Sequence, residues 1–219
     1  MIPAPPAADR QAAVTKAALG AMLILAMLVP ACMEDDVELA VYDAAAPIDP
    51  VREVEAAIEA IHEGLPEELA SHIRFEAVAL EDGDLVAPVP AGWEAGAIPW
   101  NLRPPSGEDA ELDLGFHTQY GLGFACAGRC EPKDWANALA DQEFAQFTAS
   151  DSFEVIRDER VHRNGRLIVA QRGAAIYLVV AWWREGASRY AFCRATLDGP
   201  AAEAAEAFES ACRAAHFEL

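Results

Sequence analysis

The sequence predicts an α+β fold in which helices lie on both faces of an antiparallel β meander. Three observations predict it: helix-type apolar spacing after Pro50, four successive strand-like segments between residues 153 and 197, and an alanine-rich amphipathic segment over 200–215. A strand that is apolar throughout must be covered on both faces, so we expect a helix layer on each side of the meander. Residues 50–219 are expected to form this single domain, which is long enough to bury a sizeable core.

The first helix is predicted to begin at Pro50. Asp49 is a favourable N-cap, and proline is tolerated at the first helical position because its missing N–H would have no partner there. Apolar residues then recur at spacings of three and four, which is typical of an amphipathic helix. They are Val51, Val54, Ile58, Ile61 and Leu65. We expect this stripe to pack in the core of the same chain, and an interface with another subunit is the alternative.

The middle of the chain predicts short strands and a second helix. Residues 74–80 and 85–89 are strand-like and flank a turn, and residues 112–120 alternate as a strand does. The intervening segment 95–109 is rich in proline, glycine and acidic residues and predicts an irregular surface loop. Pro132 predicts the start of a helix with an apolar side. That side comprises Trp135, Leu139, Phe144 and Phe147.

The strand pattern is clearest over residues 153–197. Segments 153–162 and 166–171 flank Asn164-Gly165, a strong hairpin signal because both residues tolerate positive φ. Segment 175–183 is almost entirely apolar, which predicts a central strand covered on both faces. A further strand follows over 189–197, and the closing helix presents a stripe of small residues that can approach a sheet closely.

The N-terminal segment predicts export. An apolar run over residues 17–32 is shorter than the roughly 20 residues that span a bilayer. It follows Arg10 and Lys16 and ends in Val29-Pro30-Ala31-Cys32. This arrangement resembles the lipobox of bacterial lipoproteins, in which an apolar residue, two small residues and a cysteine mark cleavage and diacylation. A plain secretory signal and an uncleaved anchor helix are the alternatives.

The lipobox resemblance implies a particular organisation of the chain. Residues 1–31 would be a signal peptide, and Cys32 would be the first mature residue, carrying the palmitate-type acyl chains. The acidic segment 32–49 would be a tether. Residues 50–219 would then lie outside the cytoplasm, held at the cell membrane or the outer membrane by the lipid anchor.

The net charge and the cysteine content indicate which partners and which covalent cross-links to expect. The net charge of −20 argues against nucleic acid as a partner. An exported chain meets an oxidising compartment, so disulfides are expected among the four cysteines that follow Cys32. Cys193 with Cys212 is the favoured pair, because the inner face of the last strand and the inner face of the closing helix bring both sulfurs to one layer. Cys126 with Cys130 would form the other pair, and a redox or zinc role for Cys126 and Cys130 is the alternative.

One basic cluster surrounds the predicted hairpin and is the candidate ligand contact. It comprises Arg157, Arg160, His162, Arg163 and Arg166, with Arg172 nearby. Such a cluster could contact anionic headgroups, a glycan or the acidic N-terminal part of the chain, or it could be a solvated edge that blunts strand pairing. No motif predicts a metal, a cofactor or a catalytic residue. If the chain is an enzyme, the candidate site would gather His117, His162 and the hairpin.

The order of elements also resembles that of a known family. A strand leading to Pro90-Ala91-Gly92-Trp93, a long loop, a helix, an antiparallel meander and a closing helix before Phe217 are similar to the PsbP-like domains. That resemblance implies a non-enzymatic role. The expected function is a membrane-anchored envelope lipoprotein that acts as a binding or accessory module for an envelope protein or a small ligand. An immunity-type inhibitor of a basic protein and an envelope enzyme are the alternatives.

Overall fold

The computed structural model describes residues 49–80, 83–96, 101–105, 112–125, 135–162 and 164–219. These residues belong to one compact unit that spans residues 44–219. The predicted signal peptide, Cys32, most of the tether, the predicted Cys126–Cys130 pair and Arg163 lie outside the described residues.

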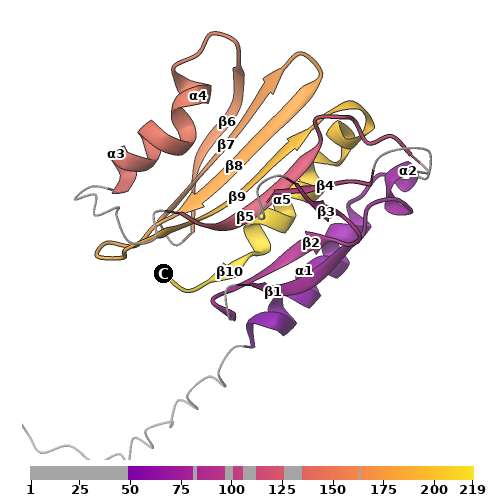
Figure 1. The fold of residues 1–219 in the computed structure, drawn as a ribbon, viewed down its shortest axis with the longest axis horizontal. Helices are drawn as coiled ribbons and strands as arrows, with labels where there is room; N and C mark the ends of the chain where they lie inside the picture. The colour runs from indigo at the N-terminus through magenta and orange to yellow at the C-terminus, as the bar shows by residue number, and fades with distance from the viewer. Residues whose placement is uncertain (1–48, 81–82, 97–100, 106–111, 126–134, 163) are drawn as a thin grey trace, which may run out of the picture. The chain divides into compact units, whose positions relative to one another are not determined.

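The fold is α+β, as predicted, and is built on two antiparallel sheets (Figure 1). The larger sheet has seven strands in the order β3-β4-β5-β9-β8-β7-β6. Its strands are β3 (Glu94–Ala95), β4 (Asn101–Arg103), β5 (Gln119–Ala125), β6 (Glu154–Val161), β7 (Gly165–Arg172), β8 (Ala175–Trp182) and β9 (Tyr190–Leu197). The smaller sheet has the order β1-β2-β10, with strands β1 (Phe75–Leu80), β2 (Leu85–Pro90) and β10 (His216–Phe217).

Helices lie on both faces of the seven-stranded sheet. The first group comprises α1 (Pro50–Glu63), α2 (Glu67–Ala70), the 3₁₀ helix η3 (Gly199–Ala204) and α5 (Ala205–Ala214). The second comprises α3 (Trp135–Leu139), the π-helical turn η2 (Ala140–Phe144) and α4 (Ala145–Thr148). Helix α5 contacts β8 and β9, while η2 contacts β8 and α4 contacts β6. The predicted helix layers on two faces are therefore present.

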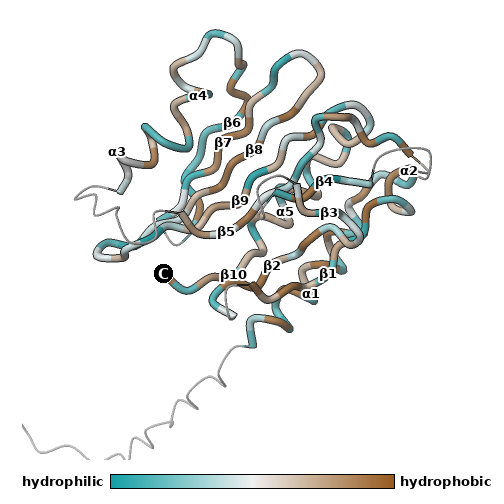
Figure 2. Tube along the Cα trace, in the orientation of Figure 1, coloured by the Kyte–Doolittle hydropathy of each residue, from teal (hydrophilic) through white to brown (hydrophobic). Residues whose placement is uncertain are grey.

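Strand alternation produces two separate cores. Figure 2 shows that β8, which contributes to both, is mostly hydrophobic. Cys193 and Val180 face the core that contains α1, α5 and the small sheet. Phe192 and Ala181, one residue away on the same strands, face the core under α3 and α4. Because neighbouring side chains on a strand point to opposite faces, the almost entirely apolar β8 supplies both cores.

Helix α1 begins where the sequence predicts. The Asp49 carboxylate caps it by accepting a hydrogen bond from the Val51 N–H at 3.1 Å. Val54, Ile58 and Ile61 are buried, and the helix packs against β1, β2 and α5. The apolar stripe thus serves the core of this chain, whereas Val51 at its start remains exposed.

Helix α5 is enclosed by both sheets and by α1. It contacts α1, β2, β8 and β9, and alanines cover much of its surface. Phe208 is completely buried and lies 5.3 to 5.6 Å, ring centre to ring centre, from Phe75, Trp93 and Tyr120. A disulfide joins Cys212 to Cys193 on β9, with the two Cα atoms 5.4 Å apart. This is the pair favoured from the sequence.

Two local expectations are wrong. Residues 112–118 are not a strand, and β5 starts only at Gln119. Gly115 has a φ of +98°, and the buried Thr118 hydroxyl donates to the Leu114 carbonyl at 2.6 Å, so the chain turns there. The segment 95–109 is not irregular throughout either, because Asn101–Arg103 form β4, which pairs with β3 and β5. The predicted hairpin is present: β6 and β7 pair as far as Val161 and Gly165, and Asn164 between them has a φ of +53°.

Candidate functional site

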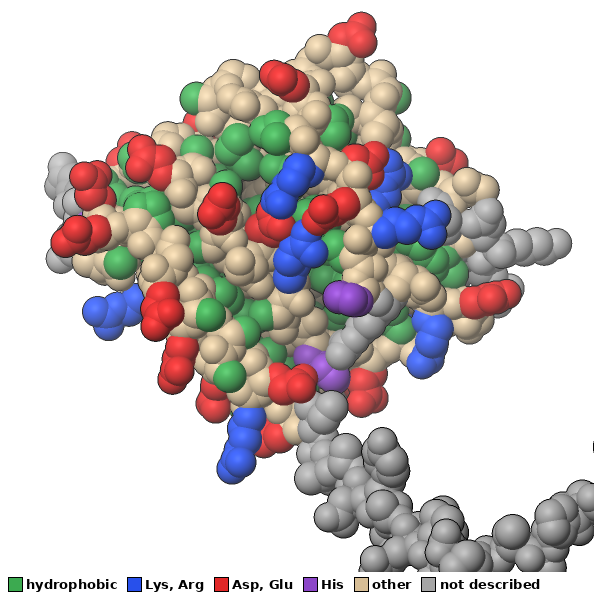
Figure 3. Space-filling view, turned by 180° about the vertical axis from the view of Figure 1, so that it is seen from behind, with side chains coloured by type: hydrophobic (Ala, Val, Ile, Leu, Met, Phe, Trp, Pro, Cys, Tyr) green, Lys and Arg blue, Asp and Glu red, His purple; other side chains and the backbone are tan. Residues whose placement is uncertain are grey.

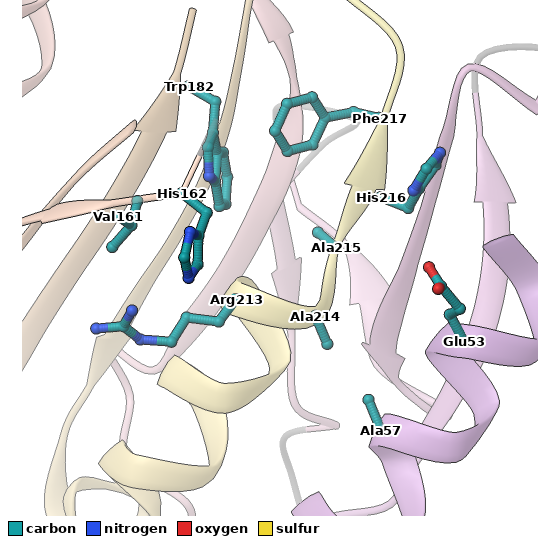
Figure 4. Close-up of a pocket in the computed structure, with 10 residues that line it drawn as sticks. All are labelled: Glu53, Ala57, Val161, His162, Trp182, Arg213, Ala214, Ala215, His216 and Phe217. Carbon is teal, nitrogen blue, oxygen red and sulfur yellow. The ribbon is translucent and has the colours of Figure 1, made fainter. Parts of the chain in front are cut away.

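A cleft of about 410 Å³ opens beside the short C-terminal strand β10 (Figure 4). It lies where four parts of the chain meet: the start of α1, the end of β6 with the connection to β7, the end of β8, and the segment from the end of α5 through β10. Its polar and aromatic lining comprises Glu53, His162, Trp182, Arg213, His216 and Phe217. A hollow of about 600 Å³ shares His216 and Phe217 with it and adds Asn164, Trp183 and Arg184.

Trp182 and Phe217 form an aromatic wall of the cleft. Their ring centres are 4.7 Å apart, and both side chains are largely buried. Trp182 ends β8 directly opposite Gly165 on β7. A Cβ atom at Gly165 would lie only 2.6 Å from Trp182 Cδ1, so the absence of a side chain there makes room for the indole.

Two imidazoles lie on opposite sides of β10. Figure 4 shows His162 beside Trp182 and Arg213, and His216 on the side that faces α1. His216 is placed by the pairing of β10 with β2, in which its partner is Val86. Its Nδ1 atom is buried and has no hydrogen-bond partner among the described residues. A buried polar nitrogen of this kind is unfavourable unless a water or a ligand satisfies it.

Arg213 belongs both to the cleft and to an ion-pair network. Its Nε donates to Glu209 Oε1 at 2.8 Å, and its Nη2 pairs with Glu159 on β6. Glu209, which is 8% exposed, also pairs with Arg157 on β6. Two arginines and two glutamates thus join α5 to the edge strand, which fixes Arg213 at the wall of the cleft.

The arginines predicted as a ligand contact do not form one cluster. Arg157 points towards α5, whereas Arg166 lies on the opposite face of the sheet, with its guanidinium 4.8 Å from the centre of the Phe144 ring. Arg166 also makes two hydrogen bonds to Asp158, at 2.8 and 2.7 Å. Arg160 is exposed, and among the described members of the predicted set only His162 lines the cleft.

The candidate enzyme site is not assembled. His117 precedes Gln119, whose partner Thr196 lies near the end of β9. His162 follows Val161. In the sheet Val161 pairs with Gly165, Gly165 pairs with Trp182, and Trp182 pairs with Ala191 near the start of β9. The two ends are separated by roughly 17 Å along β9, from the rise of a strand. His117 and His162 therefore cannot act on one small substrate.

The sequence did not indicate the cleft because its walls are distant in the chain. The signals that could have suggested it are local: the Trp182-Trp183-Arg184 run before a turn, and the His216-Phe217 pair close to the C-terminus. Neither has a recognisable spacing. No group of three His, Cys, Asp or Glu side chains within the described ranges is arranged to hold a metal ion. No helix in the described part of the chain is long and apolar enough to cross a membrane.

Comparison with solved structures finds remote similarities, among them two Mog1 structures. No family model matches the chain, and no curated protein sequence matches it. The Ran-binding protein Mog1p of Saccharomyces cerevisiae is 10% identical, with a TM-score of 0.46, over 66% of this chain and 96% of that one. A mutant of protein Mog1 is 9% identical, with a TM-score of 0.45 and the same coverage.

The Gly165→Ala variant should displace the Trp182 indole, which forms one wall of the cleft. The added methyl would lie 2.5 Å from Val161 Cγ2 and 2.6 Å from Trp182 Cδ1, so the indole must move. We expect the free energy of unfolding to fall by about 1–3 kcal/mol, as for other overpacked positions. The indole N–H resonance of Trp182 should shift as well. Gly64→Ala is the control, because a Cβ there meets its nearest atoms at 3.6 Å. Equal effects of both variants would contradict this description of the cleft wall.

The Arg166→Met variant should raise the pKa of Asp158. The hydrogen bonds from Arg166, followed by its charge, hold the pKa of this carboxyl below its ordinary value of 3.8. A lowered pKa stabilises the fold above the ordinary value, and this stabilisation is lost as the pH falls through the folded-state value. The stability difference between wild type and variant should therefore shrink in acid. NMR titration of Asp158 checks this, with exposed Arg184→Met as the control. An unchanged Asp158 pKa in Arg166→Met would contradict the assignment.

Proposed function

We propose that this chain is an exported lipoprotein whose folded domain is a binding or accessory module of the cell envelope. In this proposal Cys32 carries the acyl chains, residues 32–49 form the tether, and residues 50–219 lie outside the cytoplasm. Two or more acyl chains make membrane attachment durable. The partner is an envelope protein or a small ligand.

The cleft beside β10 is the observation that carries a binding role. Its volume of about 410 Å³ is in the range of small-molecule sites, roughly 300–1,000 Å³. An aromatic wall and a few nitrogen-bearing side chains line it, which is the usual composition of a site that binds an organic ligand. Arg157 makes an ion pair with Glu209 and Arg166 lies on the opposite face of the sheet, so neither lines the cleft.

The disulfide supports the proposal that the domain lies outside the cytoplasm. Cys193 and Cys212 are both completely buried and are joined in the core between β9 and α5. Structural disulfides of this kind form and persist in oxidising compartments such as the periplasm or the cell surface. The pairing therefore supports export, independently of the lipobox resemblance.

The start of α1 relates the cleft to the proposed tether. Glu53 and Ala57 line the cleft, and Glu53 is four residues after Asp49, where the predicted tether joins the domain. Four residues of helix rise roughly 6 Å. The cleft is thus close to the attachment point, which suits a module that binds its ligand or partner near the membrane.

Mass spectrometry of the protein from the membranes of its own cells tests the proposal. The mature wild-type chain should begin at Cys32 and carry acyl mass, and Cys32→Ser should leave the membrane fraction. Met33→Ser keeps the thiol and should still be acylated. Protein that begins elsewhere, or that carries no lipid, would contradict the proposal.

The proteins that co-purify with anchored and soluble forms provide the second readout. A partner that is enriched with the wild type and lost with Cys32→Ser supports an accessory role at the membrane. A single basic protein that stays bound to both forms and dissociates in high salt would instead support the immunity-type inhibitor.

A further inference from the structure

We infer that the cleft beside β10 binds a small amphipathic anion, an apolar body that carries one carboxylate or phosphate group. This inference rests on the proposed function and assigns a ligand class to its site. The apolar body would lie against Trp182 and Phe217, and the anionic group would accept hydrogen bonds from His162 and Arg213.

The polar side chains that line the cleft are mostly nitrogen-bearing and can donate hydrogen bonds to an anion. The chain as a whole is strongly acidic, with a net charge of −20. In the face shown in Figure 3, acidic side chains are spread widely, and basic and histidine side chains lie among them. Within the cleft, His162, Arg213 and His216 are accompanied by one carboxylate, that of Glu53. The adjoining hollow adds Arg184.

Arg213 can still donate to a ligand. Its Nε and Nη2 are used by Glu209 and Glu159, and Nη1 takes no part in those pairs. The ion pairs hold the guanidinium in place, so its remaining N–H groups are oriented before any ligand arrives. Figure 4 shows the Arg213 side chain extending below the His162 ring. One oxyanion could therefore accept from both residues.

His216 provides a second polar contact across β10. Its Nδ1 is buried and has no hydrogen-bond partner among the described residues. Ligand binding that satisfies Nδ1 removes an unfavourable feature of the free protein. The small side chains of Ala57, Ala214 and Ala215 line the space between His162 on one side of β10 and His216 on the other.

Four probes with similar ten-carbon chains and different headgroups separate the contribution of the charge to binding from that of the apolar chain. They are decanoate, decyl phosphate, decanol and decyltrimethylammonium, each added below its micelle concentration to the full Cys32→Ser chain, in which no acyl group competes. Calorimetry gives the affinities, and NMR follows the ring protons of His162 and His216. Decanoate or decyl phosphate should bind one per chain, and decanol at least about tenfold more weakly, because it lacks a charge-assisted hydrogen bond. Preference between the two anions distinguishes a fatty-acid source from a phospholipid source.

Histidine variants locate the site. His162→Ala should weaken anion binding by at least about fivefold and leave decanol binding unchanged, since only the charge-assisted contact is lost. His216→Ala should weaken it by a smaller factor. His117→Ala is the matched control, because His117 is exposed at the other end of β9 and should bind as the wild type does.

Several outcomes would overturn the inference. They are equal affinity for decanol and the anions, binding of the decyl cation, no binding of any probe, or equal losses in His117→Ala and His162→Ala. Failure here is distinguishable from failure of the proposed function. If the wild type is acylated at Cys32 and the Cys32→Ser chain binds no probe, the ligand class alone is contradicted. If the wild type carries no acyl mass, the lipoprotein role is contradicted whatever the probes do.

Discussion

The enclosure of α5 is the constraint on which the rest of the structure depends. One side of this helix must fit β8 and β9, and the other must fit α1 and β2. Small residues allow close approach on both sides, and the one aromatic side chain of α5, Phe208, fills the space among Phe75, Trp93 and Tyr120. Burial raises the pKa of Tyr120 well above its ordinary value, so its hydroxyl stays protonated and donates to the Pro88 carbonyl at 2.9 Å. These contacts join the two sheets through one helix.

The cleft follows from the position of α5. The chain leaves the helix at Ala214 and enters β10 at once, and β10 pairs with Leu85 and Val86 of β2. The same short segment therefore completes the small sheet, carries Phe217 to Trp182 and places His216 next to α1. The Cys193–Cys212 disulfide and the pairs of Glu209 with Arg157 and Arg213 hold the end of α5 that precedes it. A binding site with a wall fixed in this way loses little entropy when a ligand enters.

Local signals in the sequence were sufficient for most of the fold. The Asp49-Pro50 start, the apolar spacing of α1 and the meander all depend on neighbouring residues, and the structure contains them. The turn at 112–118 was missed because it depends on a distant contact: the Asp198 N–H donates to the Thr118 hydroxyl at 3.0 Å, and a Cβ on Gly115 would lie 2.6 Å from the Asp198 carbonyl oxygen. The π-helical turn at 140–144 interrupts a helix that the apolar pattern predicts as continuous.

The candidate site was far less predictable than the fold. Arg157 and Arg166 are close in sequence, but strand alternation and cross-strand pairing send them to opposite faces of the sheet, where Glu209 and Asp158 bind them. The cleft itself combines residue 53 with residues 162, 182 and 213–217, and no spacing in a single sequence reveals such a set. Its lining could be identified only after the topology brought the start of α1 and the C-terminal segment together.

Hydrogen exchange in the Cys193→Ala/Cys212→Ala double variant tests most directly whether α5 holds the cleft wall. We expect amides of residues 212–217 to exchange much faster than in the wild type, while those of β7, on the far side of β8, change little. Unchanged protection of residues 212–217, or an equal increase throughout the seven-stranded sheet, would contradict the account.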